Sequence, residues 1–292
     1  MVGKGKADSH RQLEAERDHA IPTVSCDYMY MGTEKGRIDT EDLSQHCLPI
    51  LAIKDQAKRY VESFVVPAKG VRHKYPAQAL SQVLKRSGYN ELIFKSDQEP
   101  AILALKRAGV EELRKEQPSL RVQWEESQTY ASASNASVER CNWEVASLTR
   151  SLKSHVQALH GITLDANHPI LVWAVRYAGQ ILSRCQRSSF DGKTAYELRR
   201  GKPYRRMLPP FGEAVSFMRP GKQRAKLADR FETGVYLGVG TEKGAFKVRS
   251  MKRLPAPQRS NPQLVEKLKG CLLYTSDAAD EGLGVDLGGR RI

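Results

Sequence analysis

The first strand of the core is predicted at Ile21-Pro-Thr-Val-Ser-Cys-Asp-Tyr-Met-Tyr-Met-Gly32, an apolar run that carries one carboxylate, Asp27, and closes on a glycine. Residues 48–54 and 59–66 are two further apolar runs rich in β-branched side chains. The four residues between them are typical of a hairpin, which Pro67 and Gly70 end. The folded part of the chain is therefore expected to begin with three strands.

The next segments alternate between helix and strand. Residues 75–87 have helical periodicity that stops at Gly88, and residues 91–96 are a short apolar strand that runs into Asp97. The remaining segments are a helix at 102–117, a strand at 121–124, a long amphipathic helix capped by Ser134 or Asn135, and an apolar helix at 169–185. This order predicts an α/β domain with a mixed sheet flanked by helices.

The residue pattern changes after Phe190. A basic stretch at 199–206 leads to three short strand-like runs at 213–218, 233–239 and 244–249, which favour a small β-barrel or β-meander. The predicted organisation is a polar N-terminal segment (1–20), an α/β core (21–188), a basic linker (189–208), a small β-barrel-like domain (209–258) and a disordered tail (259–292).

The charge is unevenly distributed along the chain. The 292 residues hold 47 Lys and Arg against 33 Asp and Glu, a net charge of +14. Residues 1–139 are balanced at 20 basic and 20 acidic side chains, whereas residues 140–260 hold 23 basic and 8 acidic ones. Such a positive region favours a polyanion, with nucleic acid as the leading candidate, and a basic surface kept for solubility is the alternative.

Apolar runs and cysteines limit the class of protein further. No run approaches the roughly 20 apolar residues of a membrane helix, and the N-terminus leads into charged sequence, so neither membrane spanning nor secretion is expected. The five cysteines show no Cys-x-x-Cys spacing, which argues against a zinc module and against disulfides, and favours a reducing compartment such as cytosol or nucleus.

Three carboxylates are candidate metal ligands. Asp27 lies within the first strand, Asp97 follows the fourth strand after 69 intervening residues, and Glu139 opens the long helix after another 41. If the first and fourth strands are neighbours, Asp27 and Asp97 lie at adjacent strand ends with the helix start above them. Mg²⁺ would relieve their mutual repulsion, and two such ions about 3.5–4 Å apart can promote in-line displacement at phosphorus. The alternative is that each acid serves as a turn or cap residue.

Glu99 is the nearest rival acid in the sequence. It lies two residues after Asp97, at the start of the following predicted helix. A negative charge at that position suits the helix dipole, so a role in the helix start is favoured for Glu99 over metal binding.

Several ordered segments resemble the retroviral integrase catalytic core, most closely the integrases of copia-type LTR retrotransposons. The three acidic segments are Val24-Ser-Cys-Asp27-Tyr, Lys95-Ser-Asp97-Gln-Glu-Pro-Ala and Ser134-Asn-Ala-Ser-Val-Glu139-Arg-Cys-Asn. The downstream segments are Thr194-Ala-Tyr-Glu-Leu-Arg-Arg-Gly-Lys-Pro, Pro210-Phe-Gly-Glu and Arg230-Phe-Glu-Thr-Gly-Val-Tyr-Leu-Gly-Val. The resemblance covers about residues 21–255.

The resemblance implies a ribonuclease-H-like fold and a magnesium-dependent polynucleotidyl transferase, a DNA integrase. Asp27, Asp97 and Glu139 would then be the catalytic carboxylates and would bind two Mg²⁺ or Mn²⁺ ions. The implied partners are double-stranded DNA, as element ends and target, and further copies of the chain. The implied location is the nucleus, with a cytoplasmic virus-like particle before integration.

Three departures from the family pattern accompany the resemblance. The 41-residue interval is longer than is usual in the family, which implies an insertion near Gly109 to Leu120, and Ala136 replaces the expected glycine after Asn135. The zinc module that precedes the core in complete integrases is absent from this sequence. Met1 is therefore not expected to be the start of the complete enzyme.

Basic side chains downstream are candidate DNA contacts. Arg150 and Lys153 follow Glu139 by 11 and 14 residues and share its helix face, where a solvated surface is the alternative. The linker cluster has the density of a DNA-backbone track, and consists of Arg199, Arg200, Lys202, Arg205 and Arg206. Trp143 could flank DNA, but packing is expected.

The competing functional hypotheses explain many of the same sequence features. A catalytically inactive, element-derived DNA-binding remnant would keep the fold and the basic surface but not the chemistry. A bacterial-type transposase or a ribonuclease H would share the metal chemistry, but is disfavoured by the downstream segments. At the C-terminus, residues 271–292 resemble the translation of a sequencing-library adapter, with an ordinary polar tail as the alternative.

Overall fold

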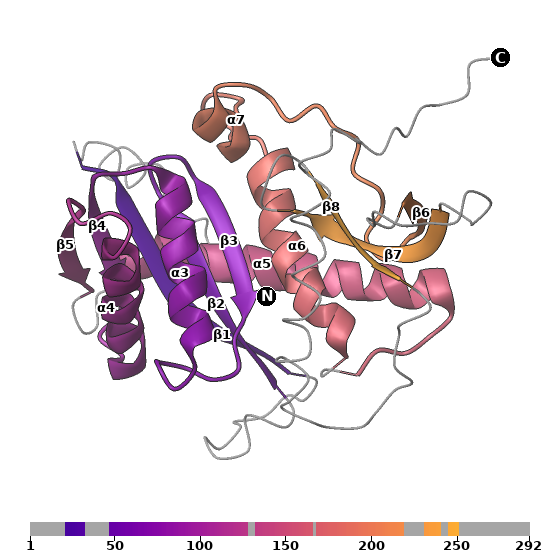
Figure 1. Cartoon of the computed structure of the whole chain (residues 1–292), viewed down its shortest axis with the longest axis horizontal. Coiled ribbons are helices and arrows are strands. Elements are labelled where there is room, and N and C mark those ends of the chain that lie inside the picture. Colours follow the sequence, from indigo (N-terminus) through magenta and orange to yellow (C-terminus); the bar gives the residue numbers. More distant parts are fainter. Residues whose placement is uncertain are drawn as a thin grey trace, which may run out of the picture.

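A computed structural model of the chain describes residues 21–32, 47–127, 132–165, 168–218, 231–240 and 245–250 (Figure 1). The predicted N-terminal segment 1–20 and tail 259–292, with its adapter-like residues, lie outside this set. The side chains of Ser134 and Asn135 also lie outside it, but the helix that one of them was expected to cap begins earlier, at Ser132, so that prediction is wrong.

Three strands form the antiparallel half of the main sheet. β1 (Thr23–Gly32) pairs with β2 (Cys47–Asp55), and β2 pairs with β3 (Tyr60–Val65). In the tight turn between β2 and β3, the Lys58 backbone N–H donates to the Asp55 carboxylate at 3.0 Å, and Arg59 takes a left-handed conformation (φ 56°). The predicted hairpin is therefore confirmed.

Two parallel strands complete the main sheet. β4 (Glu91–Ser96) pairs with β1 and β5 (Arg121–Glu126) pairs with β4, which gives the strand order β3-β2-β1-β4-β5. The intervening helices are α3 (Lys74–Ser87), ended by a left-handed Gly88, and α4 (Pro100–Arg114). The interval 109–120, where an insertion was expected, holds the end of α4 and the turn into β5.

Helices cover both faces of this sheet (Figure 1). α3 and α4 pack on one face, where alternate β1 residues Val24, Cys26 and Tyr28 point into an apolar cluster. α5 (Ser132–His160) and α6 (Pro169–Cys185) pack on the other face. This arrangement confirms the predicted fold class, a ribonuclease-H-like mixed sheet flanked by helices.

Hydrogen bonds from side chains join α6 to the edge strand β3. The Ser183 hydroxyl accepts from Val61 N and contacts Val61 O, each at 2.8 Å, and the Ser63 hydroxyl donates to Val175 O at 2.6 Å. A Cβ on Gly179 would lie 2.8 Å from the Ser63 hydroxyl oxygen, so only glycine permits this close approach. The edge of the sheet is thereby covered.

The second sheet packs on α6. β6 (Ala214–Met218), β7 (Phe231–Val239) and β8 (Phe246–Ser250) form an open antiparallel sheet in the order β6-β7-β8. Tyr236 of β7 is buried in the same apolar cluster as Tyr177 of α6, so the described strands share a core with the main domain. A closed barrel would need further strands, and the barrel therefore stays a prediction.

Among the described residues, no helix is both long and apolar enough to cross a membrane.

Candidate active site

The first two predicted acids lie on neighbouring strands. β1 and β4 run parallel with Ser25 opposite Lys95. Continuing that register by two residues places Asp97, just beyond the end of β4, level with Asp27. Because side chains alternate along a strand, Asp27 faces α5, whereas its neighbours Cys26 and Tyr28 face α3 and α4.

Asp27 is held by two hydrogen bonds in a half-buried position. Its carboxylate accepts from its neighbour Tyr28 N at 2.7 Å and from the Asn142 side-chain amide of α5 at 2.8 Å. Burial raises the pKa of Asp27 to about 6; the Asp97 and Glu99 carboxylates also raise it, and the two hydrogen bonds oppose these effects. The effect of Asp97 on this pKa has the direction expected for two neighbouring carboxylates.

Glu99 has its own role at the start of α4, as the N-cap residue. Its carboxylate accepts from Lys69 Nζ at 2.7 and 2.8 Å, and its backbone N–H donates to Asp97 at 3.3 Å. Lys69 also lies over the rings of Tyr28 and Tyr30, at 5.4 and 5.1 Å. This agrees with the helix-start role favoured for Glu99, because its charge is already paired.

Glu139 lies exposed near the start of α5. The residues that anchor this part of the helix are Val138 and Cys141, both fully buried. No group of three or more His, Cys, Asp or Glu side chains in the described residues is arranged to hold a metal ion. The convergence of Glu139 with Asp27 and Asp97 therefore stays a prediction.

The α5 residue that contacts Asp27 is Asn142, which sequence reasoning missed. It lies three residues after Glu139, so the two share one side of the helix, and that spacing was the available signal. While its amide nitrogen donates to Asp27, its Oδ1 is buried and has no hydrogen-bond partner among the described residues. A buried acceptor of this kind calls for a ligand, a water or an ion.

The donor chemistry at this point fits a divalent metal. Asp27, Asp97 and the unpartnered Asn142 Oδ1 are hard oxygen donors, which Mg²⁺ prefers. The nearby lysines already have partners, since Lys69 pairs with Glu99 and buried Lys106 donates to Ser96 Oγ at 3.0 Å and to a backbone carbonyl. A bound cation would offset the repulsion between Asp27 and Asp97.

Two of the predicted DNA contacts lie on α5, the helix that also carries Glu139 and Asn142. Arg150 is exposed and Lys153 is half-buried on the continuous helix that carries Glu139. Trp143 is 68% exposed, so the expected packing is wrong. The reason is that α5 turns its Val138, Cys141 and Val145 face to the sheet, and Trp143 falls outside that face.

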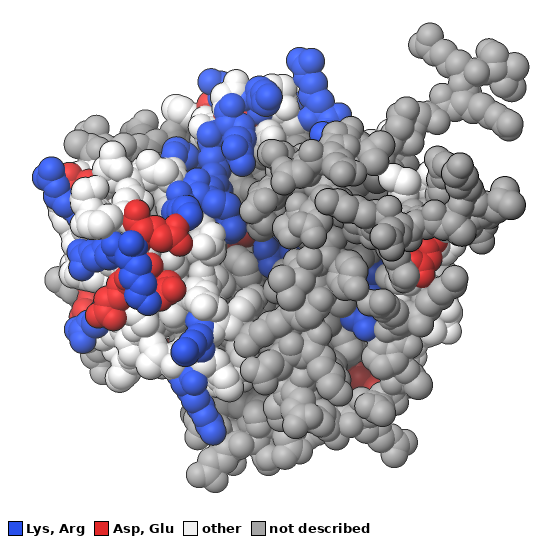
Figure 2. All heavy atoms as spheres, viewed as in Figure 1, with Lys and Arg blue, Asp and Glu red and all other residues white. Residues whose placement is uncertain are grey.

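The predicted linker cluster divides into two groups. α7 (Ala195–Arg200) begins with a capping box between Thr194 and Glu197, and its Arg199 places its guanidinium 4.3 Å from the Tyr60 ring centroid. Burial lowers the pKa of Arg199, whose guanidinium packs on Tyr60 in this structure, and its predicted contact with DNA stays a prediction. The other four members are exposed, namely Arg200, Lys202, Arg205 and Arg206. Figure 2 shows basic side chains gathered over α7.

Two solved structures are similar to this chain in fold. A chain of the simian T-cell lymphotropic virus intasome, solved in complex with PP2A regulatory subunit B56 gamma, is 13% identical; the match covers 82% of this chain and 81% of that one, with a TM-score of 0.40. The catalytic core domain of BIV integrase is 18% identical; the match covers 61% of this chain and 92% of that one, with a TM-score of 0.39. These likenesses concern the fold alone.

No protein-family model matches the sequence, and a search of curated proteins gives no match.

Proposed function

We propose that this chain is an integrase fragment of a copia-type LTR retrotransposon that inserts element DNA into target DNA by strand transfer. The observation that carries the proposal is that Asp97, directly after β4, lies level with Asp27 on the parallel neighbour β1, with Asn142 of α5 hydrogen-bonded to Asp27. The sequence resemblance at the three acidic segments and the positive charge of residues 140–260 support it.

The chemistry requires no protein nucleophile. Asp27, Asp97 and Glu139 would hold two Mg²⁺ or Mn²⁺ ions, which when bound would activate a DNA 3′-hydroxyl and stabilise the leaving oxygen of the target phosphodiester. Asn142 orients the Asp27 carboxylate, and Lys69 pairs with the Glu99 carboxylate. Arg150 and Lys153 would bind phosphates along α5 without reading sequence.

The expected partners are double-stranded DNA and further copies of this chain. Nuclear action, after a stage in a cytoplasmic virus-like particle, belongs to the same proposal. It rests on the resemblance to retrotransposon integrases.

The proposal is tested by a strand-transfer assay on the full chain with labelled LTR-end duplexes and Mg²⁺ or Mn²⁺. Glu139→Gln should abolish product formation. Glu144→Gln is the matched control, because Glu144 lies on the same helix but pairs with Arg140 at 3.1 Å. Strand transfer that survives in Glu139→Gln would remove Glu139 from the catalytic set.

One observation favours a second candidate, the catalytically inactive DNA-binding remnant: Glu139 is exposed, and no group of three or more acidic, His or Cys side chains among the described residues is arranged to hold a metal ion. Thermal unfolding with and without Mn²⁺ separates the two candidates. An integrase should be stabilised by Mn²⁺ in wild type and not in Asp97→Asn. A remnant should bind DNA with no carboxylate-dependent stabilisation by the metal.

A further inference from the structure

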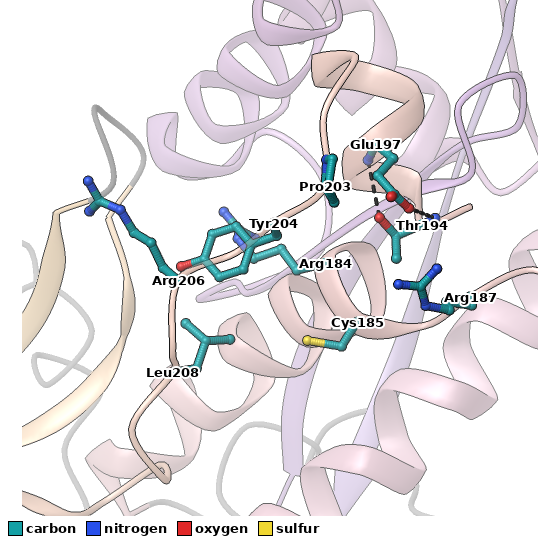
Figure 3. A pocket seen from close by; sticks show the side chains of 9 residues that line it. All are labelled: Arg184, Cys185, Arg187, Thr194, Glu197, Pro203, Tyr204, Arg206 and Leu208. Atoms are coloured by element: carbon teal, nitrogen blue, oxygen red, sulfur yellow. Dashed lines mark hydrogen bonds between the residues drawn. The ribbon is translucent and has the colours of Figure 1, made fainter. Parts of the chain in front are cut away.

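A cavity of about 290 Å³ lies between the end of α6, the start of α7 and the chain that follows α7 (Figure 3). Three arginines line it, Arg184, Arg187 and Arg206, against one carboxylate, Glu197. The Glu197 carboxylate accepts from Thr194 N at 2.7 Å as part of the capping box, so it is already engaged with the backbone. The lining therefore carries more positive than negative charge, and its one carboxylate already accepts a hydrogen bond from the backbone.

The Arg184 guanidinium is fixed in position at this cavity. It lies over the rings of Tyr196 and Tyr204, at 5.8 and 5.6 Å from their centroids, and its Nη1 donates to Gln180 O at 3.2 Å. A cation held between two aromatic rings and a carbonyl is preorganised, so little side-chain entropy remains to be lost when a ligand binds.

Two buried polar atoms at the cavity lack partners in the described part of the chain. They are Arg184 Nε and Tyr204 Oη. An unmade hydrogen bond on a buried group is costly, and nearly all such groups in proteins find a partner. Nε–H is a donor and the tyrosine hydroxyl can donate, so each could pair with an acceptor oxygen of a ligand.

We propose that this cavity binds a phosphate group of DNA, with Arg184, Arg187 and Tyr204 as the binding residues. A guanidinium fork matches the oxygens of a phosphate, and the lining residues carry more positive than negative charge. The cavity adjoins α7, over which basic side chains gather (Figure 2), so a backbone that follows that surface reaches it. Because DNA is the source of the phosphate, this inference rests on the proposed function.

Tyr204→Phe is the sharpest variant, because the hydroxyl it removes has no partner in the described chain and the ring stays. We expect a thermal unfolding temperature equal to or above that of wild type, because an unpartnered buried hydroxyl is removed, and about tenfold weaker binding of a short fluorescein-labelled duplex, measured by fluorescence anisotropy. Tyr196→Phe is the matched control, since Tyr196 contacts Arg184 but does not line the cavity, and it should bind like wild type.

Arg187→Gln tests the charge of the cavity. We expect weaker duplex binding and a salt dependence, as log affinity against log salt, that is shallower by about one unit. Arg121→Gln removes an exposed arginine of β5, at the far edge of the main sheet, and should leave the affinity nearly unchanged.

A second measurement separates DNA from small phosphate compounds. Unfolding is followed in sodium phosphate and in sodium chloride of equal ionic strength, and phosphate should stabilise wild type more than Tyr204→Phe. If Tyr204→Phe and Arg187→Gln both bind DNA like wild type but are no longer stabilised by phosphate, the cavity binds a phosphate that does not come from DNA. If neither readout changes, the cavity is not a phosphate site. An absence of strand transfer by wild type would leave these readouts valid, because they measure binding alone.

Discussion

The two faces of the main sheet differ in what they bury. Beneath α3 and α4, the face is mainly apolar, with Val24 and Phe94 at most 1% exposed, and the buried ammonium there, that of Lys106, is hydrogen-bonded to Ser96. Beneath α5 and α6, apolar packing is interrupted by Asp27, Asn142 and the serines that bond β3 to α6. The first face contributes mainly stability, whereas the second carries polar groups that cost stability and can do chemistry.

The largest effect is expected on the apolar face. Phe94 is fully buried and its ring stacks on Trp124 at 6.1 Å between centroids. Phe94→Ala should lower the free energy of unfolding by about 3–5 kcal/mol, because it loses apolar burial and leaves a cavity. Chemical denaturation measures this change. A loss below about 1 kcal/mol would contradict the assignment of this face as the main stabilising layer.

An intermediate effect is expected where β8 packs on α6. Lys247 is 7% exposed and lies 4.9 Å from the Trp173 ring centroid. Burial lowers the pKa of Lys247 from 10.5 to about 7; Arg176 and Arg86 also lower it, while Glu62 opposes them. Between those two values the unfolded chain binds more protons, so this residue makes the free energy of unfolding rise with pH from about 7 to 10.5.

Lys247→Met should therefore stabilise the protein at neutral pH by about 2–4 kcal/mol and flatten that rise. Unfolding measured across this pH range tests it. Lys115→Met, at a side chain that is 69% exposed, should change little. An unchanged pH profile in Lys247→Met would show that the buried ammonium is not the source of the dependence.

The smallest effect on stability, and the one that separates the two faces most clearly, is expected at Asp27. Its folded pKa of about 6 exceeds the ordinary 3.8, so the folded chain loses stability as pH rises from about 4 to 6. Asp27→Asn should add about 1–2 kcal/mol at neutral pH without metal, and Asn142 can turn its amide to pair with the new side chain. It should also abolish strand transfer. A destabilised variant would refute the electrostatic cost assigned to this face.

Much of the fold could be predicted because its elements are locally encoded. The strand at Asp27, the hairpin, the helix ended by Gly88 and the helix at 169–185 all lie within a few residues of their predicted bounds, since hydrophobic period and turn residues act over short range. The strand order could not be predicted from these local patterns, and the structure decides that β1 and β4 are neighbours, which the sequence left as a condition.

Only part of the candidate site could be predicted from the sequence. The identity of the three acids followed from residue type and ordered segments. The roles of Asn142, Arg184 and Tyr204 did not, because a lone amide, a basic residue on an apolar helix and a linker tyrosine have no local signature. The prediction that Trp143 packs was wrong for a related reason, because the exposure of a helix face depends on what packs against it.

By itself, the sequence determined the order of helices and strands, the neutral and basic halves, and the acids that chemistry could use. These are properties of local pattern and composition. Only the tertiary structure decided that Asn142 reaches Asp27, that Glu99 is paired with Lys69, and that Arg184 and Tyr204 meet at one cavity. Such contacts join residues far apart in the chain, and they are fixed by strand register and helix packing, which no short segment encodes.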